Sequence, residues 1–299
     1  MSQTLPAAAT ADPSTGSSLH AHPEIDRLER SAQRGRALHD NGKFTWRSWG
    51  EGDPVLLLHG SHGGWAHWVH NIEALAKSRR VIAPDMPGFG ESDPPADIEC
   101  PESHARIIAD ALPAMTNDKP TDIVGFSLGA LIACWIAIRR SDAVRRLILV
   151  DAGGLDTPMR FADLRPIKGV PAEERRAVNR HNLGAMMLHD PARIDDLAID
   201  IAMHYGRLSR TRVQFHVIPD NLIKVVARTR APIDLIWGEH DYAHPDPEVN
   251  AAVIRRYHPE AELRVVPAAG HWSMYECPQA FNAALLDLLE RDPRPTLEM

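Results

Sequence analysis

DIVGFSLGALIACWIAIRR, residues 122–140, contains the pattern from which the fold of this chain can be inferred. An apolar run of strand length comes first, and a segment with helical periodicity follows it. Ser127 lies at the junction between them and is flanked by Gly125 and Gly129. Two glycines so placed allow a sharp turn that lifts the serine hydroxyl out of a sheet and holds it at the N-terminus of a helix. The junction therefore predicts a strand, a strained turn carrying Ser127, and a helix.

Apolar runs of strand length recur along the chain, at residues 55–60, 81–85, 147–152, 233–238 and 263–268. Segments with helical periodicity separate these runs. Nearly continuous apolar strands that alternate with helices are typical of a parallel sheet covered on both faces. We therefore predict an α/β fold with a mostly parallel sheet flanked by helices.

The alternation is interrupted once, between the strand that ends near Asp151 and the strand that starts near Ile233. Residues 173–187 and 194–205 within this interval have helical periodicity, and no convincing strand lies there. A helical cap inserted into the core after strand 6 is the simplest interpretation. Residues 1–22 lack apolar periodicity. The predicted division is a disordered tail at 1–22, an α/β core at 23–154 and 229–292, and a cap at 155–228.

The overall composition limits the partners of the protein. The 299 residues carry a formal net charge of −7 with acidic and basic residues interspersed, so nucleic acid is not an expected partner. No apolar run reaches the roughly 20 residues of a membrane-spanning helix, and no secretory signal begins the chain, which predicts a cytoplasmic protein without membrane contact. The three cysteines are far apart and form no C-x-x-C pair, so we expect reduced thiols.

A second glycine-rich element, HGSHGGW at residues 59–65, follows an apolar strand and opens another predicted helix. Its glycines permit close approach of the backbone to a ligand. We expect the backbone N–H groups of Ser61 and Leu128 to converge on the oxygen that becomes negative in a tetrahedral intermediate. That arrangement is an oxyanion hole.

His271 follows the last predicted strand directly, within Gly270-His271-Trp272. This position is at the carboxyl end of a strand, on the same rim of a parallel sheet as Ser127. An imidazole there can take the proton from a serine hydroxyl and return it to a leaving group near neutral pH. We therefore predict that Ser127 is a nucleophile and that His271 is its base.

The acid that orients this base should also be presented by a strand end. Asp241 follows the run 233–238, and Asp151 ends the run 147–152. Asp241 is the first choice, because the chain order Ser, Asp, His is then that of hydrolases with this type of serine turn. Asp151 is the alternative.

Two further histidine pairs have spacings that suggest a metal site, His67 with His70 and His240 with His244. Neither pair has a clear third ligand, whereas a catalytic zinc usually has three protein ligands. We predict no metal and no cofactor, and interpret these histidines as solvated or packed.

The motifs, taken in order over residues 44–290, resemble the α/β-hydrolase superfamily. They are HG at 59–60, PDMPGFGES at 84–92, GFSLG at 125–129, GEHD at 238–241 and GHW at 270–272. The resemblance implies the Ser-His-Asp chemistry described above.

Within that superfamily, HW at 271–272 with PQAFN at 278–282 is similar to the meta-cleavage-product hydrolases, which cut carbon–carbon bonds in vinylogous diketones. That group usually has Asn where this chain has Phe126. It also carries a cap arginine for the substrate carboxylate, and Arg207 and Arg180 are the candidates here.

The sequence therefore predicts a serine hydrolase that cleaves a small, largely apolar carboxylic ester through an acyl-enzyme intermediate. We expect Phe126, Trp272 and Met187 to contact this small-molecule substrate, because apolar cap residues would close a pocket over Ser127. The departure at Phe126 favours an ester. Carbon–carbon bond hydrolysis is the alternative, and a ligand-binding receptor on the same fold is a third hypothesis. The oligomeric state is open, with a homodimer as one option.

Overall fold

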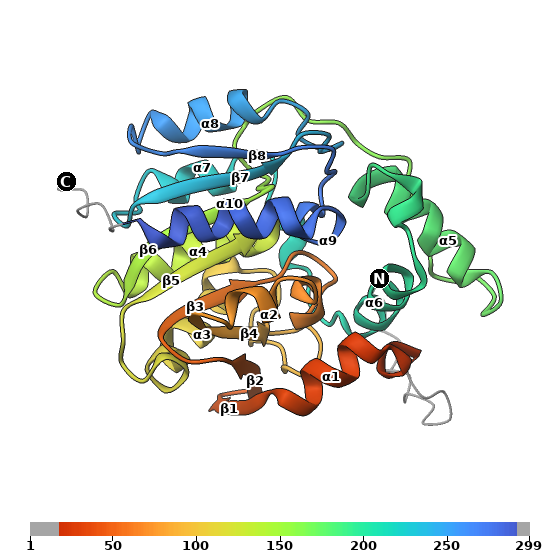
Figure 1. Ribbon diagram of the computed structural model, residues 1–299, viewed down its shortest axis with the longest axis horizontal. Coiled ribbons are helices and arrows are strands. Elements are labelled where there is room, and N and C mark those ends of the chain that lie inside the picture. Colours follow the sequence, from red (N-terminus) through yellow and green to blue (C-terminus); the bar gives the residue numbers. More distant parts are fainter. Residues whose placement is uncertain (1–17, 292–299) are drawn as a thin grey trace, which may run out of the picture.

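A sheet of eight strands forms the centre of the protein, in the order β1-β2-β4-β3-β5-β6-β7-β8 (Figure 1). The computed structural model describes residues 18–291. β1 pairs with β2, and β2 with β4, in antiparallel fashion, whereas the other pairs are parallel. The predicted mostly parallel α/β sheet is confirmed. Its strands are β1 (Gln33–His39), β2 (Gly42–Trp49), β3 (Asp53–Leu58), β4 (Arg79–Asp85), β5 (Thr121–Phe126), β6 (Val144–Val150), β7 (Ile233–Gly238) and β8 (Leu263–Val266).

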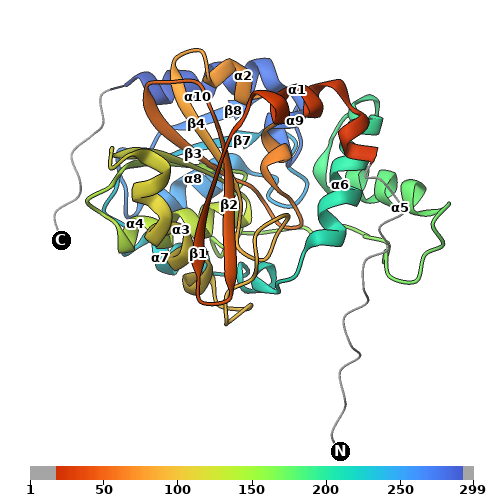
Figure 2. The same cartoon turned by 90° about the horizontal axis from the view of Figure 1, so that it is seen from below.

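Helices cover both faces of the sheet and bury two separate apolar clusters. One cluster includes side chains of α3, α4, α7 and α8, and the other includes side chains of α1, α2 and α10. Figure 2 shows α1, α2 and α10 on one side of the sheet and α3 and α4 on the other. The core helices are α1 (Pro23–Ser31), α2 (Ile72–Leu75), α3 (Pro101–Thr116), α4 (Leu128–Arg139), α7 (Asn221–Val226), α8 (Pro247–Arg255), α9 (Ser273–Glu276) and α10 (Pro278–Glu290), with the short 3-10 helix η2 (Trp65–Trp68).

The apolar run of β3 illustrates why the strands are continuously apolar. Leu56 and Leu58 belong to one cluster, while Val55 and Leu57 belong to the other. Successive side chains of a strand point to opposite faces, so a strand covered on both faces has no position left for a polar residue.

The helical insertion lies between β6 and β7, beyond the carboxyl ends of the strands (Figure 1). α7 packs against α4 and joins the core, because its apolar residues Leu222, Val225 and Val226 are buried there. The predicted cap, 155–228, includes α7, which in the structure packs with the core instead. No helix in the described residues is long and apolar enough to cross a membrane. The insertion comprises α5 (Arg175–Asn182), the π-helical turn η3 (Leu183–Met187), η4 (Pro191–Arg193), α6 (Asp196–Leu208) and η5 (Val213–His216).

The predicted tail covers residues 1–22, of which residues 1–17 lie outside the described residues. The prediction of disorder is wrong for the remainder, since residues 18–21 form the 3-10 helix η1 (Ser18–Ala21). Leu19 is buried, and His22 Nε2 lies 2.8 Å from Asp200 Oδ2 on α6. One buried leucine and one polar contact thus hold this segment against the cap.

Polar contacts also attach the cap to the loop that carries His271. The buried carboxylate of Glu276 accepts hydrogen bonds from the backbone N–H groups of His189, Asp190 and Gly270. The N–H of Trp272 donates to the carbonyl of Met187 at 2.8 Å. The cap and the His271 loop are therefore positioned together.

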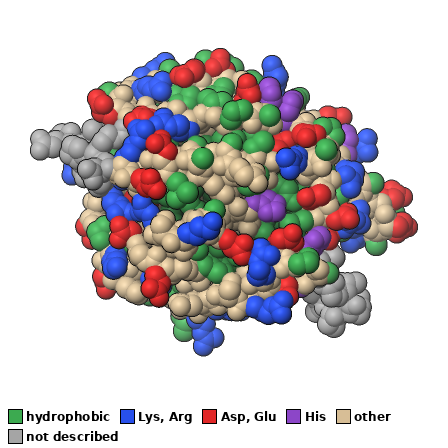
Figure 3. Space-filling view, viewed as in Figure 1, with side chains coloured by type: hydrophobic (Ala, Val, Ile, Leu, Met, Phe, Trp, Pro, Cys, Tyr) green, Lys and Arg blue, Asp and Glu red, His purple; other side chains and the backbone are tan. Residues whose placement is uncertain are grey.

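The face seen in Figure 3 carries acidic and basic side chains in a mixed pattern. At the amino ends of the central strands, charged side chains form a buried network. Asp122 is fully buried and receives hydrogen bonds from the guanidinium groups of Arg79, Arg145 and Arg146. Removing one partner of a buried charge network leaves the others uncompensated.

We predict that Asp122→Asn lowers the free energy of unfolding by about 3–5 kcal/mol, because the buried Arg146 loses its carboxylate partner. Urea denaturation followed by circular dichroism measures the change. The control is Asp53→Asn, which removes an exposed partner of Arg145 and should cost at most about 1 kcal/mol. Equal losses for the two variants would contradict the role of the buried network.

Candidate active site

The turn at Ser127 has the strained backbone that the sequence predicts. Ser127 has φ 52° and ψ −115° and separates β5 from α4. A Cβ at Gly125 would lie 2.4 Å from the carbonyl oxygen of Gly129, and a Cβ at Gly129 would lie 2.5 Å from that of Leu58. Neither glycine can be replaced without moving backbone. The N–H of Ser127 donates to the carbonyl of Val150 at 2.9 Å, which ties the turn to the neighbouring strand.

The glycine-rich loop after β3 lies directly against this turn. A Cβ at Gly60 would lie 2.8 Å from the Phe126 ring and 3.3 Å from Cβ of Ser127. His59 holds the loop, because its Nδ1 lies 2.7 Å from the Gly60 carbonyl and its Nε2 accepts from the N–H of Met86. Burial lowers the pKa of His59 to about 4, so the ring is neutral and serves both contacts.

The two predicted oxyanion donors belong to these neighbouring elements. Leu128 is the first residue of α4, where backbone N–H groups have no acceptor within the helix. Ser61 lines the same cavity as Ser127. The arrangement is compatible with an oxyanion hole formed by the two amides, which stays a prediction.

His271 lies at the other side of the cavity and contacts Asp241. Its Nδ1 lies 3.0 Å from Asp241 Oδ2. Burial opposes the charge of each partner. The attraction to the Asp241 carboxylate nevertheless raises the pKa of His271. In turn, the contacts of Asp241 with His271 and His244 hold the pKa of Asp241 far below its usual range. Asp241 is therefore the ionised partner of His271.

Asp151, the alternative acid, makes different contacts. Its carboxylate accepts hydrogen bonds from the N–H of Gly238 at 2.7 Å and from the hydroxyl of Ser273 at 2.6 Å. Burial, together with the nearby charge of Asp241, raises its pKa well above the usual range. Within the described residues no hydrogen bond joins it to His271. These contacts favour Asp241 as the orienting acid.

Asp241, His244 and His271 offer potential metal ligands within 4.8 Å of one another. Both histidines approach the carboxylate through Nδ1 at hydrogen-bonding distance, and N–H donors explain these contacts without a metal. We interpret the group as a hydrogen-bond network, and the absence of a metal stays a prediction. The buried His244 and His67 are not solvated.

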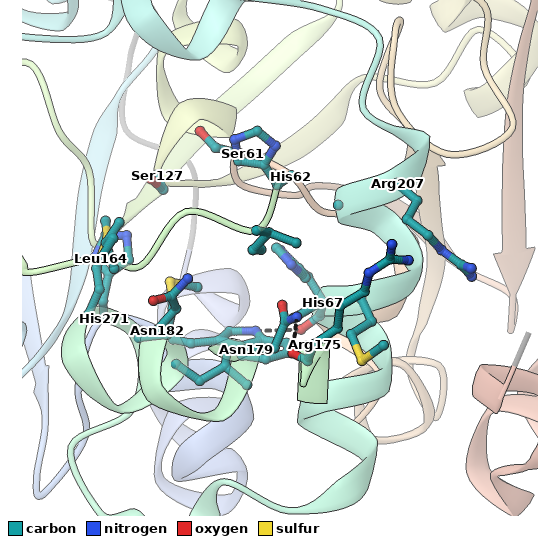
Figure 4. A pocket seen from close by; sticks show the side chains of 18 of the residues that line it. Ser61, His62, His67, Ser127, Leu164, Arg175, Asn179, Asn182, Arg207 and His271 are labelled. Carbon is teal, nitrogen blue, oxygen red and sulfur yellow. Dashed lines mark hydrogen bonds between the residues drawn. The ribbon is translucent and has the colours of Figure 1, made fainter. Parts of the chain in front are cut away.

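A cavity of about 630 Å³ lies between the core and the cap. Ser127, which is half-buried, and His271 both line it (Figure 4). Phe126, Trp272 and Met187, the predicted substrate contacts, line it as well. Its core wall consists of Ser61, His62, His67, Phe126, Ser127, His271 and Trp272, and its cap wall includes Leu164, Ile167, Lys168, Arg175, Asn179, Asn182, Leu183, Met186, Met187, Met203 and Arg207.

Several polar residues at the cavity were missed by the sequence analysis. Of the two candidate cap arginines, Arg207 lines the cavity, whereas Arg180 donates to the carbonyl of Ile194 elsewhere in the cap. Lys168 and Arg175 also line it. Figure 4 shows Arg175 and Arg207 across the cavity from Ser127 and His271. Helical periodicity marks the cap helices but does not reveal which of their charges face inward.

Comparison with known proteins agrees with this architecture. Residues 53–185 match the family described as alpha/beta hydrolase fold. A 2-hydroxymuconate semialdehyde hydrolase of Pseudomonas putida is 30% identical over 87% of this chain and 92% of its own, and the enzyme of the same name from Pseudomonas sp. strain CF600 is 29% identical over 89% and 94%. The crystal structure of a variant of a meta-cleavage product hydrolase is 26% identical, with a TM-score of 0.66, covering 85% of this chain and 97% of that one. The chain belongs to the α/β-hydrolase fold family.

We predict that Asp241→Asn lowers the pKa of His271, because burial then acts without the opposing carboxylate charge. Titration of the histidine side chains by NMR measures this change. Asp151→Asn is the matched control. Asp151 bonds to Gly238 and Ser273 and raises the pKa of His271 without a hydrogen bond to it, so this variant should lower that pKa less. A larger effect of the Asp151 variant would show that the orienting acid has been misassigned.

Proposed function

We propose that this hydrolase uses Ser127 as its nucleophile, His271 as general base and Asp241 as the acid that orients His271, and that it cleaves a carbon–carbon bond next to a ketone in a carboxylate-bearing substrate. The observation that carries the substrate class is the charge of the cavity wall. Lys168, Arg175 and Arg207 line the cavity, and none of its lining residues is acidic. The chain as a whole has a net charge of −7, yet the charged residues of this cavity wall are all cationic, which favours an anionic ligand.

The cationic residues are suited to a carboxylate. Arg207 and Lys168 have no carboxylate partner within the described part of the chain, and the Nε of Arg175 donates only to the Val170 carbonyl. Guanidinium groups pair with carboxylates through two parallel hydrogen bonds. A substrate whose carboxylate lies at this end would place its carbonyl toward Ser127 and His271, on the opposite wall (Figure 4).

The relatives support the same type of reaction. Both are named as hydrolases of 2-hydroxymuconate semialdehyde, and the related crystal structure is named as a meta-cleavage product hydrolase. We infer a substrate of the same class, a dienoate with a ketone or aldehyde separated from the carboxylate by conjugated carbons.

The proposed reaction proceeds in two halves. His271 takes the proton of Ser127 as Oγ adds to the ketone carbon, and the amides of Ser61 and Leu128 stabilise the oxyanion. In the substrate, the 2-hydroxyl proton has first moved to the carbon next to the ketone, which leaves a carbonyl beside the carboxylate. The carbon–carbon bond then breaks, and its electron pair passes through the conjugated carbons to that carbonyl oxygen. The oxygen takes up the proton held by His271 and becomes an enol, while the acyl group stays on Ser127 Oγ. One water molecule, deprotonated by His271, then releases the acyl group from Ser127 as a carboxylic acid.

Ester hydrolysis is the second candidate, and a specific observation supports it. Phe126 occupies the position before the nucleophile, and its ring packs 5.1 Å from that of His271. Met186, Met187 and Met203 add apolar surface from the cap. This wall suits the acyl or alkyl group of an apolar ester, and the same residues would carry out the chemistry.

We predict that Ser127→Ala lowers kcat for the true substrate by roughly four to six orders of magnitude, because the nucleophile is removed. The wild-type protein is assayed on a panel of 2-hydroxy-6-oxodienoates and aryl or alkyl esters, with fluorophosphonate labelling of Ser127 as the check on its reactivity. Turnover restricted to esters would exclude the carbon–carbon proposal. Tight ligand binding that survives Ser127→Ala, without any turnover by the wild type, would favour a receptor.

Removing a cavity cation should discriminate between charged and neutral substrates. We predict that Arg175→Ala or Arg207→Ala raises KM for a carboxylate-bearing substrate by roughly tenfold, since a charge-assisted hydrogen bond is lost, and changes KM for a neutral ester little. Arg180→Ala is the control, because this cap arginine bonds to the Ile194 carbonyl outside the cavity. The same rise in KM for both substrates would argue against a carboxylate subsite.

A further inference from the structure

His244 is a buried histidine that the proposed reaction does not use. It follows Asp241 by three residues in the loop after β7. Its ring lies edge-on to Trp237, with centroids 6.1 Å apart, and a Cβ at Gly153 would lie 3.3 Å from its Nε2. That Nε2 is buried and has no hydrogen-bond partner among residues 18–291. The side chain therefore has no polar contact on this side to determine its orientation.

The polar contacts of His244 are directed at one carboxylate. Its backbone N–H lies 3.3 Å from Asp241 Oδ1, and its Nδ1 lies 3.4 Å from Asp241 Oδ2. The same Oδ2 lies 3.0 Å from Nδ1 of His271. Two imidazoles thus approach a single oxygen, while Oδ1 also accepts from the N–H of Ala243 at 2.9 Å.

We propose that His244 is a positioning residue, which donates from Nδ1 to Asp241 and fixes the carboxylate oxygen that His271 must meet. This inference rests on the proposed function, in which Asp241 orients His271. The carboxylate has no other side-chain donor among the described residues besides these two histidines. Without His244, the backbone amides hold Oδ1 but leave Oδ2 to a single partner.

A second donor on Oδ2 has an electrostatic consequence as well. It takes up part of the negative charge that would otherwise stabilise the protonated form of His271. Three titratable groups are packed around the pair. They are His244 itself, Asp151 on the neighbouring strand end, which faces both Asp241 and His271, and the buried His67, whose charge would interact with that of His271. Loss of the His244 donor should therefore make His271 more basic.

The experiment compares His244→Phe, which keeps a ring and removes the donor, with His244→Asn, whose amide nitrogen can donate from nearly the position of Nδ1. For each variant, the NMR titration of His271 and the pH dependence of fluorophosphonate labelling of Ser127 are measured. We expect His244→Phe to move the titration of His271 and the acidic limb of labelling to higher pH. Labelling on that limb should fall by roughly threefold to tenfold, and His244→Asn should restore most of it.

His240→Phe is the control, since His240 is exposed in the same loop and stacks on His189 instead. If His244 only fills space, the Phe and Asn variants will leave the titration of His271 where it is in the wild type, and the inference is then wrong. If Ser127 of the wild type is not labelled at all, the proposed function fails, while the NMR titration still decides the role of His244. If the Phe variant does not fold, His244→Leu provides the same comparison against the Asn variant.

Discussion

The backbone of Ser127 is the constraint on which the site depends. A non-glycine residue at φ 52° and ψ −115° costs of order 1–3 kcal/mol and persists only where its surroundings leave no alternative. Here the surroundings are the missing side chains of Gly125 and Gly129, the contact of Gly60 with the turn, and the hydrogen bond to Val150. The order of strands β3, β5 and β6 supplies each of these contacts. The core of the sheet thus holds the strain that exposes the hydroxyl.

Two buried aspartates next to each other have pKa values that are shifted in opposite directions. Asp241 receives two imidazoles and two backbone N–H groups, which outweigh its burial and favour the carboxylate. Asp151 receives one amide and one hydroxyl while the charge of Asp241 acts against it, which favours its neutral form. Asp241, the carboxylate that contacts His271, is therefore the more readily ionised of the two. The position of the negative charge is decided by the hydrogen-bond donors around each oxygen.

Much of this arrangement could be predicted because it follows from local rules. The carboxyl ends of parallel strands share one rim, so Ser127 and His271 could be placed near each other from the strand pattern alone. The sequence could not predict that Lys168 and Arg175 face the cavity or that Leu19 is buried. Those features depend on how the cap packs over the core, and no periodicity in the sequence records that packing. The spacing of His240 and His244 is visible in the sequence, but the contact of His244 with Asp241 is not, for the same reason.

The acid-free wall of the cavity also bears on how the reaction ends. Hydrolysis of a carbonyl compound that already carries one carboxylate creates a second anion in the same confined space. Lys168, Arg175 and Arg207 line the space from which both fragments of the proposed substrate must depart. If the proposed reaction takes place, their charge slows the departure of the anionic fragments, and added salt, which screens that charge, weakens the effect.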